Sequence, residues 1–109
     1  MSPSPKDPID QVEWVPTDII RKIFNDGQYY QKVLDGTLTK LIKEDTLLKN
    51  PPHGEPPGTR SQMVYYLNLQ GEVVALVHQY LRPDGNMGAS GKPDPKRLIL
   101  EDRIIATKG

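Results

Sequence analysis

Basic residues and glycines gather in one stretch of this chain, residues 82–97, which reads RPDGNMGASGKPDPKR. Arginine and lysine side chains bind phosphate groups, and consecutive glycine-containing amides can converge on one anion. A loop of this length inside a small domain is usually functional or disordered. The stretch therefore predicts an anion-binding loop, with a plain solvated hairpin loop as the alternative. The candidate ligand-binding residues in it are Arg82, Ser90, Lys92, Lys96 and Arg97.

The same stretch is not a nucleotide-binding P-loop. That motif needs four residues between its first glycine and the Gly-Lys pair, followed by Ser or Thr and then a helix. Here five residues separate Gly85 from Gly91, and Pro93 follows Lys92. Prolines at 93 and 95 also prevent the helix whose N-terminal amides would face a phosphate. A looser cradle of loop amides is the remaining anion-binding arrangement.

A second group of functional side chains lies on the strand expected over residues 72–81. Strand alternation puts His78, Tyr80 and Arg82 on one face. A tight turn at residues 70–71 would place Met63 opposite His78. This face becomes polar where the strand meets the glycine-rich loop. Tyr80 therefore joins the candidate ligand-binding residues, and the strand end is the expected floor of a cleft, with an ordinary half-exposed strand end as the alternative.

One metal-independent reaction fits these residue types. Cleavage of RNA through the 2′-OH needs a base, an acid and positive charge on the phosphate. His78 is the candidate catalytic residue under this alternative, and the loop cations would stabilise the phosphate. The order of helices first and antiparallel strands second is similar to that of small microbial ribonucleases and toxin nucleases. That resemblance is one of architecture and has no motif behind it.

Other chemistries lack support in the sequence. The chain has no cysteine, so thiol catalysis, disulfides and thiolate metal sites are excluded. His53 lies in a proline-rich segment and His78 on a strand, without carboxylates at ligand spacing, so we expect no metal and no cofactor. A Ser-His-Asp set could combine Ser90 and His78 with Asp84 or Asp94. However, Ser90 lacks the Gly-x-Ser-x-Gly elbow.

The fold class follows from how helical and strand patterns are distributed. Residues 9–49 read as short helices, with Thr17 as an N-cap and Gly27 as a stop. Residues 37–43 fit either a helix or a strand. The four prolines within 50–60 make a linker, and residues 62–107 alternate as strands. We therefore expect an α+β fold in which N-terminal short helices pack on a three- or four-stranded antiparallel sheet.

This fold implies a specific set of strands and a specific core. Strands are expected over 63–69, 72–81, 97–100 and 103–107, and the second of these is expected to be covered on both faces. The residues expected to be mostly buried are Ile19, Ile23, Phe24, Val33, Leu34, Leu41, Leu67, Val74, Leu76, Leu98 and Ile104.

Composition narrows the class of protein. The chain has 109 residues with 14 basic and 14 acidic side chains, which argues against a general DNA-coating protein. Residues 1–8 are expected to be a disordered tail before one domain, 9–109. No apolar run is long enough to span a bilayer and the start is not a secretory signal, so we expect no membrane contact and a cytoplasmic location.

The expected function is a small soluble binding module for an anionic ligand, RNA included, or a protein partner. The alternative is a metal-independent, toxin-like ribonuclease.

Overall fold

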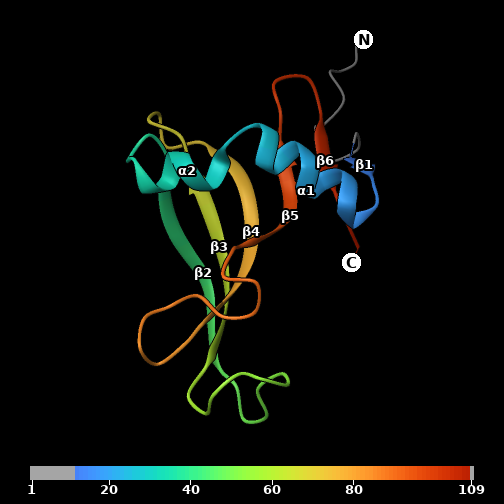
Figure 1. Cartoon of the computed structure of the whole chain (residues 1–109). Coiled ribbons are helices and arrows are strands. Elements are labelled where there is room, and N and C mark those ends of the chain that lie inside the picture. The colour runs from blue at the N-terminus through green and yellow to red at the C-terminus, as the bar shows by residue number, and fades with distance from the viewer. Residues whose placement is uncertain (1–11, 109) are drawn as a thin grey trace.

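The computed structural model describes residues 12–108, which form two short helices and a six-stranded sheet (Figure 1). The strand order is β1-β6-β5-β4-β3-β2. The domain is elongated, with extents of 54 × 28 × 23 Å. The predicted tail at residues 1–8 lies outside the described residues. The elements are β1 Val12–Trp14, α1 Thr17–Asp26, α2 Tyr29–Leu34, β2 Thr39–Leu47, β3 Arg60–Leu67, β4 Val73–Leu81, β5 Asp94–Ile99 and β6 Ile104–Ala106.

The α+β class is confirmed, but the predicted three- or four-stranded antiparallel sheet is wrong in size and pairing. The sheet is mixed, because β1 lies parallel to β6 while every other neighbouring pair is antiparallel. The three residues of β1 are too few to show an alternating pattern, so its pairing with a strand near the opposite end of the sequence leaves no local signal. The other strand missing from the prediction is β2, which lies within the half of the chain expected to be helical.

Of the two alternatives for residues 37–43, helix and strand, the structure shows a strand that begins at Thr39. Residues 39–47 pair with β3, and a register shift between Ile42 and Glu44 leaves Lys43 as an extra residue. A bulge of this kind puts two consecutive residues against one on the neighbouring strand, so period-2 alternation is lost there. The helix-like spacing came from Leu38, Leu41 and Ile42, which precede the bulge. Leu41 and Ile42 are adjacent residues of β2 and both are exposed, so no apolar alternation marks this strand.

The hairpin between β3 and β4 has the predicted register. Met63 lies opposite His78 and Tyr65 lies opposite Leu76. The connection is longer than the two-residue turn expected, since the strands end at Leu67 and resume at Val73. The side chain of Asn68 holds this connection by accepting hydrogen bonds from the amides of Gln70 (3.0 Å) and Glu72 (2.9 Å).

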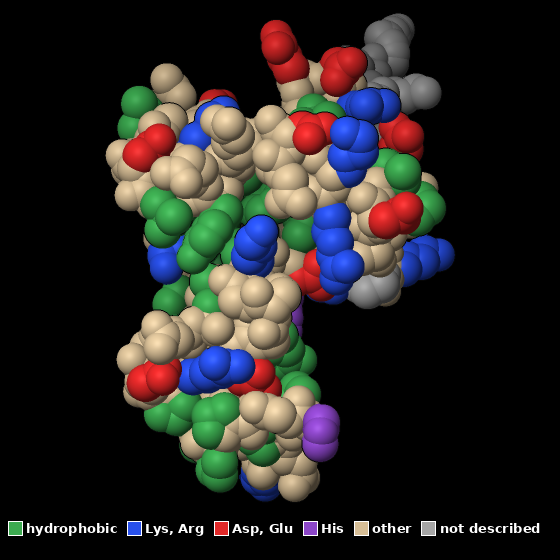
Figure 2. Space-filling view, viewed as in Figure 1, with side chains coloured by type: hydrophobic (Ala, Val, Ile, Leu, Met, Phe, Trp, Pro, Cys, Tyr) green, Lys and Arg blue, Asp and Glu red, His purple; other side chains and the backbone are tan. Residues whose placement is uncertain are grey.

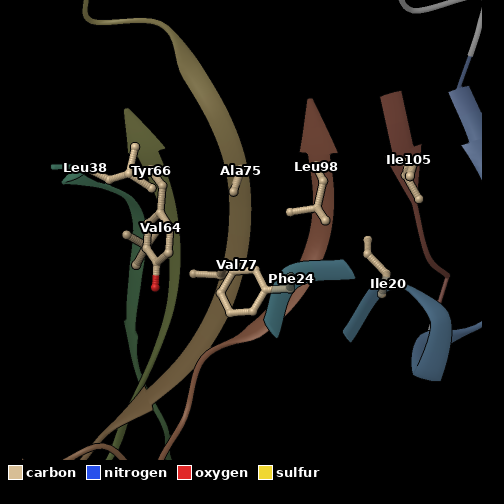
Figure 3. Close-up of a cluster of buried hydrophobic side chains, with 9 residues drawn as sticks. All are labelled: Ile20, Phe24, Leu38, Val64, Tyr66, Ala75, Val77, Leu98 and Ile105. Atoms are coloured by element: carbon tan, nitrogen blue, oxygen red, sulfur yellow. The ribbon is translucent and has the colours of Figure 1, made fainter. Parts of the chain in front are cut away.

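Helix α1 buries two side chains spaced one turn apart, Ile20 and Phe24, against one face of the sheet (Figure 3). On β4 the residues under the helices are Ala75 and Val77. Burial of these apolar side chains is the main source of stability in such a two-layer domain. The cluster consists of Ile20, Phe24, Leu38, Val64, Tyr66, Ala75, Val77, Leu98 and Ile105.

The predicted core is correct in part. Phe24, Leu98 and Ile104 are buried, whereas Ile19, Leu34 and Leu41 are 41%, 63% and 53% exposed. The remaining five predicted core residues, Ile23, Val33, Leu67, Val74 and Leu76, are only partly buried. The prediction that the second strand is covered on both faces is wrong. The two short helices cover one face of β4, so Leu76 points to the other, open face.

No helix within residues 12–108 is long and apolar enough to cross a membrane.

Candidate functional site

A cleft of about 680 Å³ opens at the waist of the molecule, where α1 and the start of β5 meet the end of β4 and the glycine-rich loop. Figure 2 shows the molecule narrowing there, with a notch at one side of the waist. The sheet extends beyond the helices at this level, and the 82–93 loop folds back along β4 (Figure 1). The lining residues are Arg21, Phe24, Asn25, Met63, His78, Tyr80, Ala89, Ser90, Lys92, Pro93, Asp94, Pro95 and Lys96.

The charges in the cleft centre on Asp94. Its carboxylate accepts a hydrogen bond from Arg21 Nε at 3.0 Å and another from Lys96 Nζ at 3.1 Å. Partial burial opposes ionisation, but the bonds from Arg21 and Lys96 lower the pKa of Asp94 below its ordinary value. Lys92 adds a third cation on the loop side. The cleft therefore carries three cations around one ionised carboxylate.

His78 occupies the strand side of the cleft. Its Nε2 lies 2.8 Å from Ser61 Oγ, and its ring meets that of Tyr80 edge-on with centroids 4.7 Å apart. Burial lowers the pKa of His78 and the nearby Lys96 lowers it further, although Asp94 acts in the opposite direction. The imidazole is therefore neutral near pH 7 and can accept a proton.

Four of the predicted ligand-binding residues meet in this cleft: Tyr80, Ser90, Lys92 and Lys96. Arg97 lies elsewhere, in a groove of about 500 Å³ on the open sheet face that it shares with Tyr65 and Leu76. Arg97 pairs with Leu76 on the open face, whereas Lys96 is the extra residue of a register shift and lines the cleft. As a result Lys96 and Arg97 point into different hollows.

The predicted site also contained Arg82, and the structure gives this residue a different partner. Its Nε and Nη2 donate to the two carboxylate oxygens of Glu55 at 3.0 and 3.1 Å. Glu55 comes from the proline-rich linker, its side chain is 5% exposed, and it also accepts a bond from the Ala89 amide at 2.8 Å. The hydrogen bond from Arg82, followed by that from Ala89, lowers the pKa of Glu55. The guanidinium of Arg82 is thus occupied in holding two loops together.

The glycine-rich loop has further internal support. The Gly88 amide donates to the Tyr80 carbonyl at 2.7 Å, and Leu81 forms an isolated bridge with Met87. The loop therefore continues the β4 edge for a short distance before it turns toward β5, and this path carries Ser90 and Lys92 to the cleft.

Sequence reasoning missed Arg21, Asn25 and Asp94 as lining residues. Arg21 and Asn25 lie four apart on the outer side of α1, so they share a helix face. No pattern within α1 indicates that this face meets the start of β5. Arg21 and Asp94, which are in contact, are 73 positions apart along the chain. Asp94 was considered only for a catalytic triad. Among residues 12–108, no three His, Asp or Glu side chains gather as metal ligands do.

A second hollow of about 430 Å³ adjoins the cleft beneath the two helices. The two hollows share Phe24, Asn25, Lys92 and Pro93. The second adds the side chains of Gln28, Tyr29, Tyr30 and Gln31. Tyr29 stacks on Phe24 with centroids 5.3 Å apart and ring planes 10° from parallel. The waist groove, defined as these two hollows together, therefore has a cationic end at Lys96 and an aromatic and amide end at α2.

Comparison of the chain with protein-family models, with curated proteins and with solved structures gave no significant match.

Proposed function

We propose that this protein is a binding module that holds a phosphate-bearing ligand in the waist groove. The observation that carries the proposal is the excess of positive charge at one end of the groove. Arg21, Lys92 and Lys96 surround a single carboxylate there, and the hydroxyls of Tyr80 and Ser90 line the same cleft. Charged donors combined with hydroxyls are the usual means of phosphate recognition.

The other end of the groove supports a ligand larger than inorganic phosphate. Tyr29 and Tyr30 line it together with the amides of Gln28 and Gln31. Aromatic rings stack on nucleobases, and side-chain amides hydrogen-bond to base edges. Lys92 belongs to both hollows and lies where a backbone phosphate would connect the two ends. A short single-stranded RNA fits this combination of charge and aromatic surface.

Nuclear magnetic resonance titration tests the proposal with two probes, inorganic phosphate and a short oligouridine. We expect shifts of the amides of residues 89–96 with both probes, and of α2 with the oligonucleotide only. Arg21→Gln and Lys92→Ala should each weaken binding about tenfold or more, the loss expected when a charged hydrogen bond worth ~1.5 kcal/mol is removed. Lys22→Gln is the matched control, because Lys22 neighbours Arg21 but pairs with Asp26 outside the cleft at 2.8 Å.

The dependence on salt separates phosphate contacts from other contacts. The logarithm of the oligouridine affinity should fall with the logarithm of salt concentration, with a slope of about 0.7 per phosphate contact. Lys92→Ala should reduce that slope and leave the melting midpoint unchanged, since exposed loop substitutions cost less than ~0.5 kcal/mol. Absence of binding by either probe at low salt would reject the phosphate ligand and favour an acidic protein partner.

Metal-independent ribonuclease activity is the second candidate function, and the neutral His78 beside Lys96 is the observation that favours it. A neutral imidazole can take the 2′-OH proton, and the ammonium of Lys96 can stabilise a phosphate. Labelled RNA incubated with the protein in EDTA provides the test. Cleavage that is lost in His78→Ala, with binding retained, would identify an enzyme. Intact RNA under conditions that saturate the groove would identify a binding module.

A further inference from the structure

Strand β2 is an unusually exposed edge of the sheet. It is the last strand in the sheet order (Figure 1). All nine of its residues are exposed. Leu41, Ile42 and Leu47 are 53%, 51% and 55% exposed. Within residues 12–108 no strand pairs with its outer side. A nine-residue edge strand whose outer amides and carbonyls have no strand partner is a ready template for another strand.

We propose that β2 pairs in antiparallel fashion with β2 of a second copy, across a two-fold axis perpendicular to the sheet. The two six-stranded sheets would then continue into one another. Symmetric dimers of this kind are the commonest oligomers, and an antiparallel strand pair satisfies their self-complementarity. The proposal concerns a surface on the edge opposite to β1 and is independent of the waist groove.

The register follows from which face each side chain of β2 occupies. Residues directly opposite each other in a sheet share a face, so Lys40 and Ile42 lie on the helix side with their partners Tyr66 and Val64. After the bulge at Lys43 the alternation is reset. Asp45 therefore lies on the helix side as well, opposite Gln62. Lys40 and Asp45 share a face only because of that bulge.

A two-fold axis through Ile42 uses this arrangement. Ile42 would lie opposite Ile42 of the second copy, and Lys40 would lie opposite Asp45 of the second copy. The bulge would place Lys43 and Glu44 together against Leu41, so that both strands keep their faces. Thr39 would then face Thr46, a favourable pair across strands.

Charge complementarity supports a second copy as the occupant. The first half of β2 carries Lys40 and Lys43, and the second half carries Glu44 and Asp45. Antiparallel pairing sets the basic half of each strand against the acidic half of the other, whereas a parallel arrangement in register would oppose like charges. Asp45 also accepts a bond from Arg60 of its own chain at 2.6 Å, and its side chain is still 36% exposed, so it can contact a second partner. A single strand pair is a small interface, so the dimer should be concentration-dependent.

Sedimentation equilibrium from micromolar to millimolar concentration tests the dimer. The average mass should rise from that of one 12.3 kDa chain to twice that value. Lys40→Asp and Asp45→Lys should each remain monomeric alone, because both symmetric contacts become repulsive. An equimolar mixture of the two variants should dimerise, because both contacts are then opposite in sign. Lys49→Asp changes a charge just beyond β2 and should leave dimerisation unchanged.

Recovery in the mixture also shows that both variants are folded. A wild-type chain that stays at the monomer mass over the whole concentration range would overturn the proposal and leave the edge for a strand of a different protein. Single variants that dimerise as well as the wild type would place the interface elsewhere. A mixture that stays monomeric would reject the register.

Discussion

Glu55 and Arg82 form a two-point ion pair that joins the proline-rich segment 50–59 to the glycine-rich loop 82–93. The carboxylate lies almost completely inside this contact and also receives the Ala89 amide. Backbone hydrogen bonds hold parts of the glycine-rich loop, but the Ala89 amide, next to Ser90, is held by the side chain of Glu55. The path that brings Ser90 and Lys92 to the waist groove therefore depends on a side chain from a different loop.

Glu55→Gln should loosen the glycine-rich loop without unfolding the sheet. The amide cannot accept two charged bonds from Arg82, so the amides of residues 84–91 should exchange with solvent faster while those of β3 and β4 stay protected. In the wild type, the stabilising contribution of Glu55 is present above its unfolded pKa, because its folded pKa is lowered. That contribution should disappear as the pH falls through the folded pKa. Hydrogen exchange against pH measures both effects.

Gly88→Ala is a second route to the same loosening. A Cβ at Gly88 would overlap the carboxylate of Glu55, so the carboxylate or the loop must move. Overpacking of this kind costs about 1–3 kcal/mol. Ser90→Ala, at an exposed position in the same loop, should leave stability within ~0.5 kcal/mol of the wild type. Equal urea midpoints for the two variants would contradict the contact between Gly88 and Glu55.

Phe24→Ala should destabilise the domain far more than Ile19→Ala. Phe24 is 3% exposed and stacks on Tyr29, whereas Ile19 is 41% exposed on the outer side of the same helix. Loss of a buried phenylalanine costs about 3–5 kcal/mol, and an exposed apolar truncation costs under ~0.5 kcal/mol. Urea unfolding of the two variants measures the difference. Similar losses for both would mean that α1 is rotated about its axis.

Tyr66→Phe should leave the protein as stable as the wild type or more stable. Tyr66 is fully buried, and its hydroxyl has no hydrogen-bond partner among residues 12–108. An unsatisfied buried hydroxyl carries a desolvation penalty of about 1–3 kcal/mol, which the phenyl ring avoids. A higher melting midpoint is the expected result. Destabilisation by more than ~1 kcal/mol would reveal that the hydroxyl has a partner.

His78→Gln should flatten the dependence of stability on pH in the slightly acidic range. Burial lowers the folded pKa of His78 below the unfolded value, so the unfolded chain binds the proton more readily. The free energy of unfolding should therefore rise with pH between the folded pKa of His78 and about 6.5. Above that pH the contribution of His78 should no longer change. His53→Gln is the control, because His53 is exposed on the proline-rich segment. A slope that follows His53 rather than His78 would contradict the geometry of the cleft.

The sequence by itself determined the features that depend on near neighbours along the chain. The pairing of Met63 with His78 was predicted correctly from alternation, although the connection is longer than the expected turn and the register shifts between Tyr66 and Leu67. The separation of a helical start from a β-rich remainder gave the α+β class. The cleft at the end of β4 beside the glycine-rich loop was also expected, and it brings together Tyr80, Ser90, Lys92 and Lys96.

Only the tertiary structure decided the contacts between distant segments. All nine residues of β2 are exposed, so no alternating apolar pattern marked it as a strand, and β1 forms its strand by pairing with β6. Arg82 looked like a ligand-binding residue until its partner from the proline-rich segment was known, and Arg21 had no local sign of reaching Asp94. Such contacts depend on how elements stack and which strands become neighbours. Local residue patterns do not encode that choice, because many packings bury the same apolar side chains.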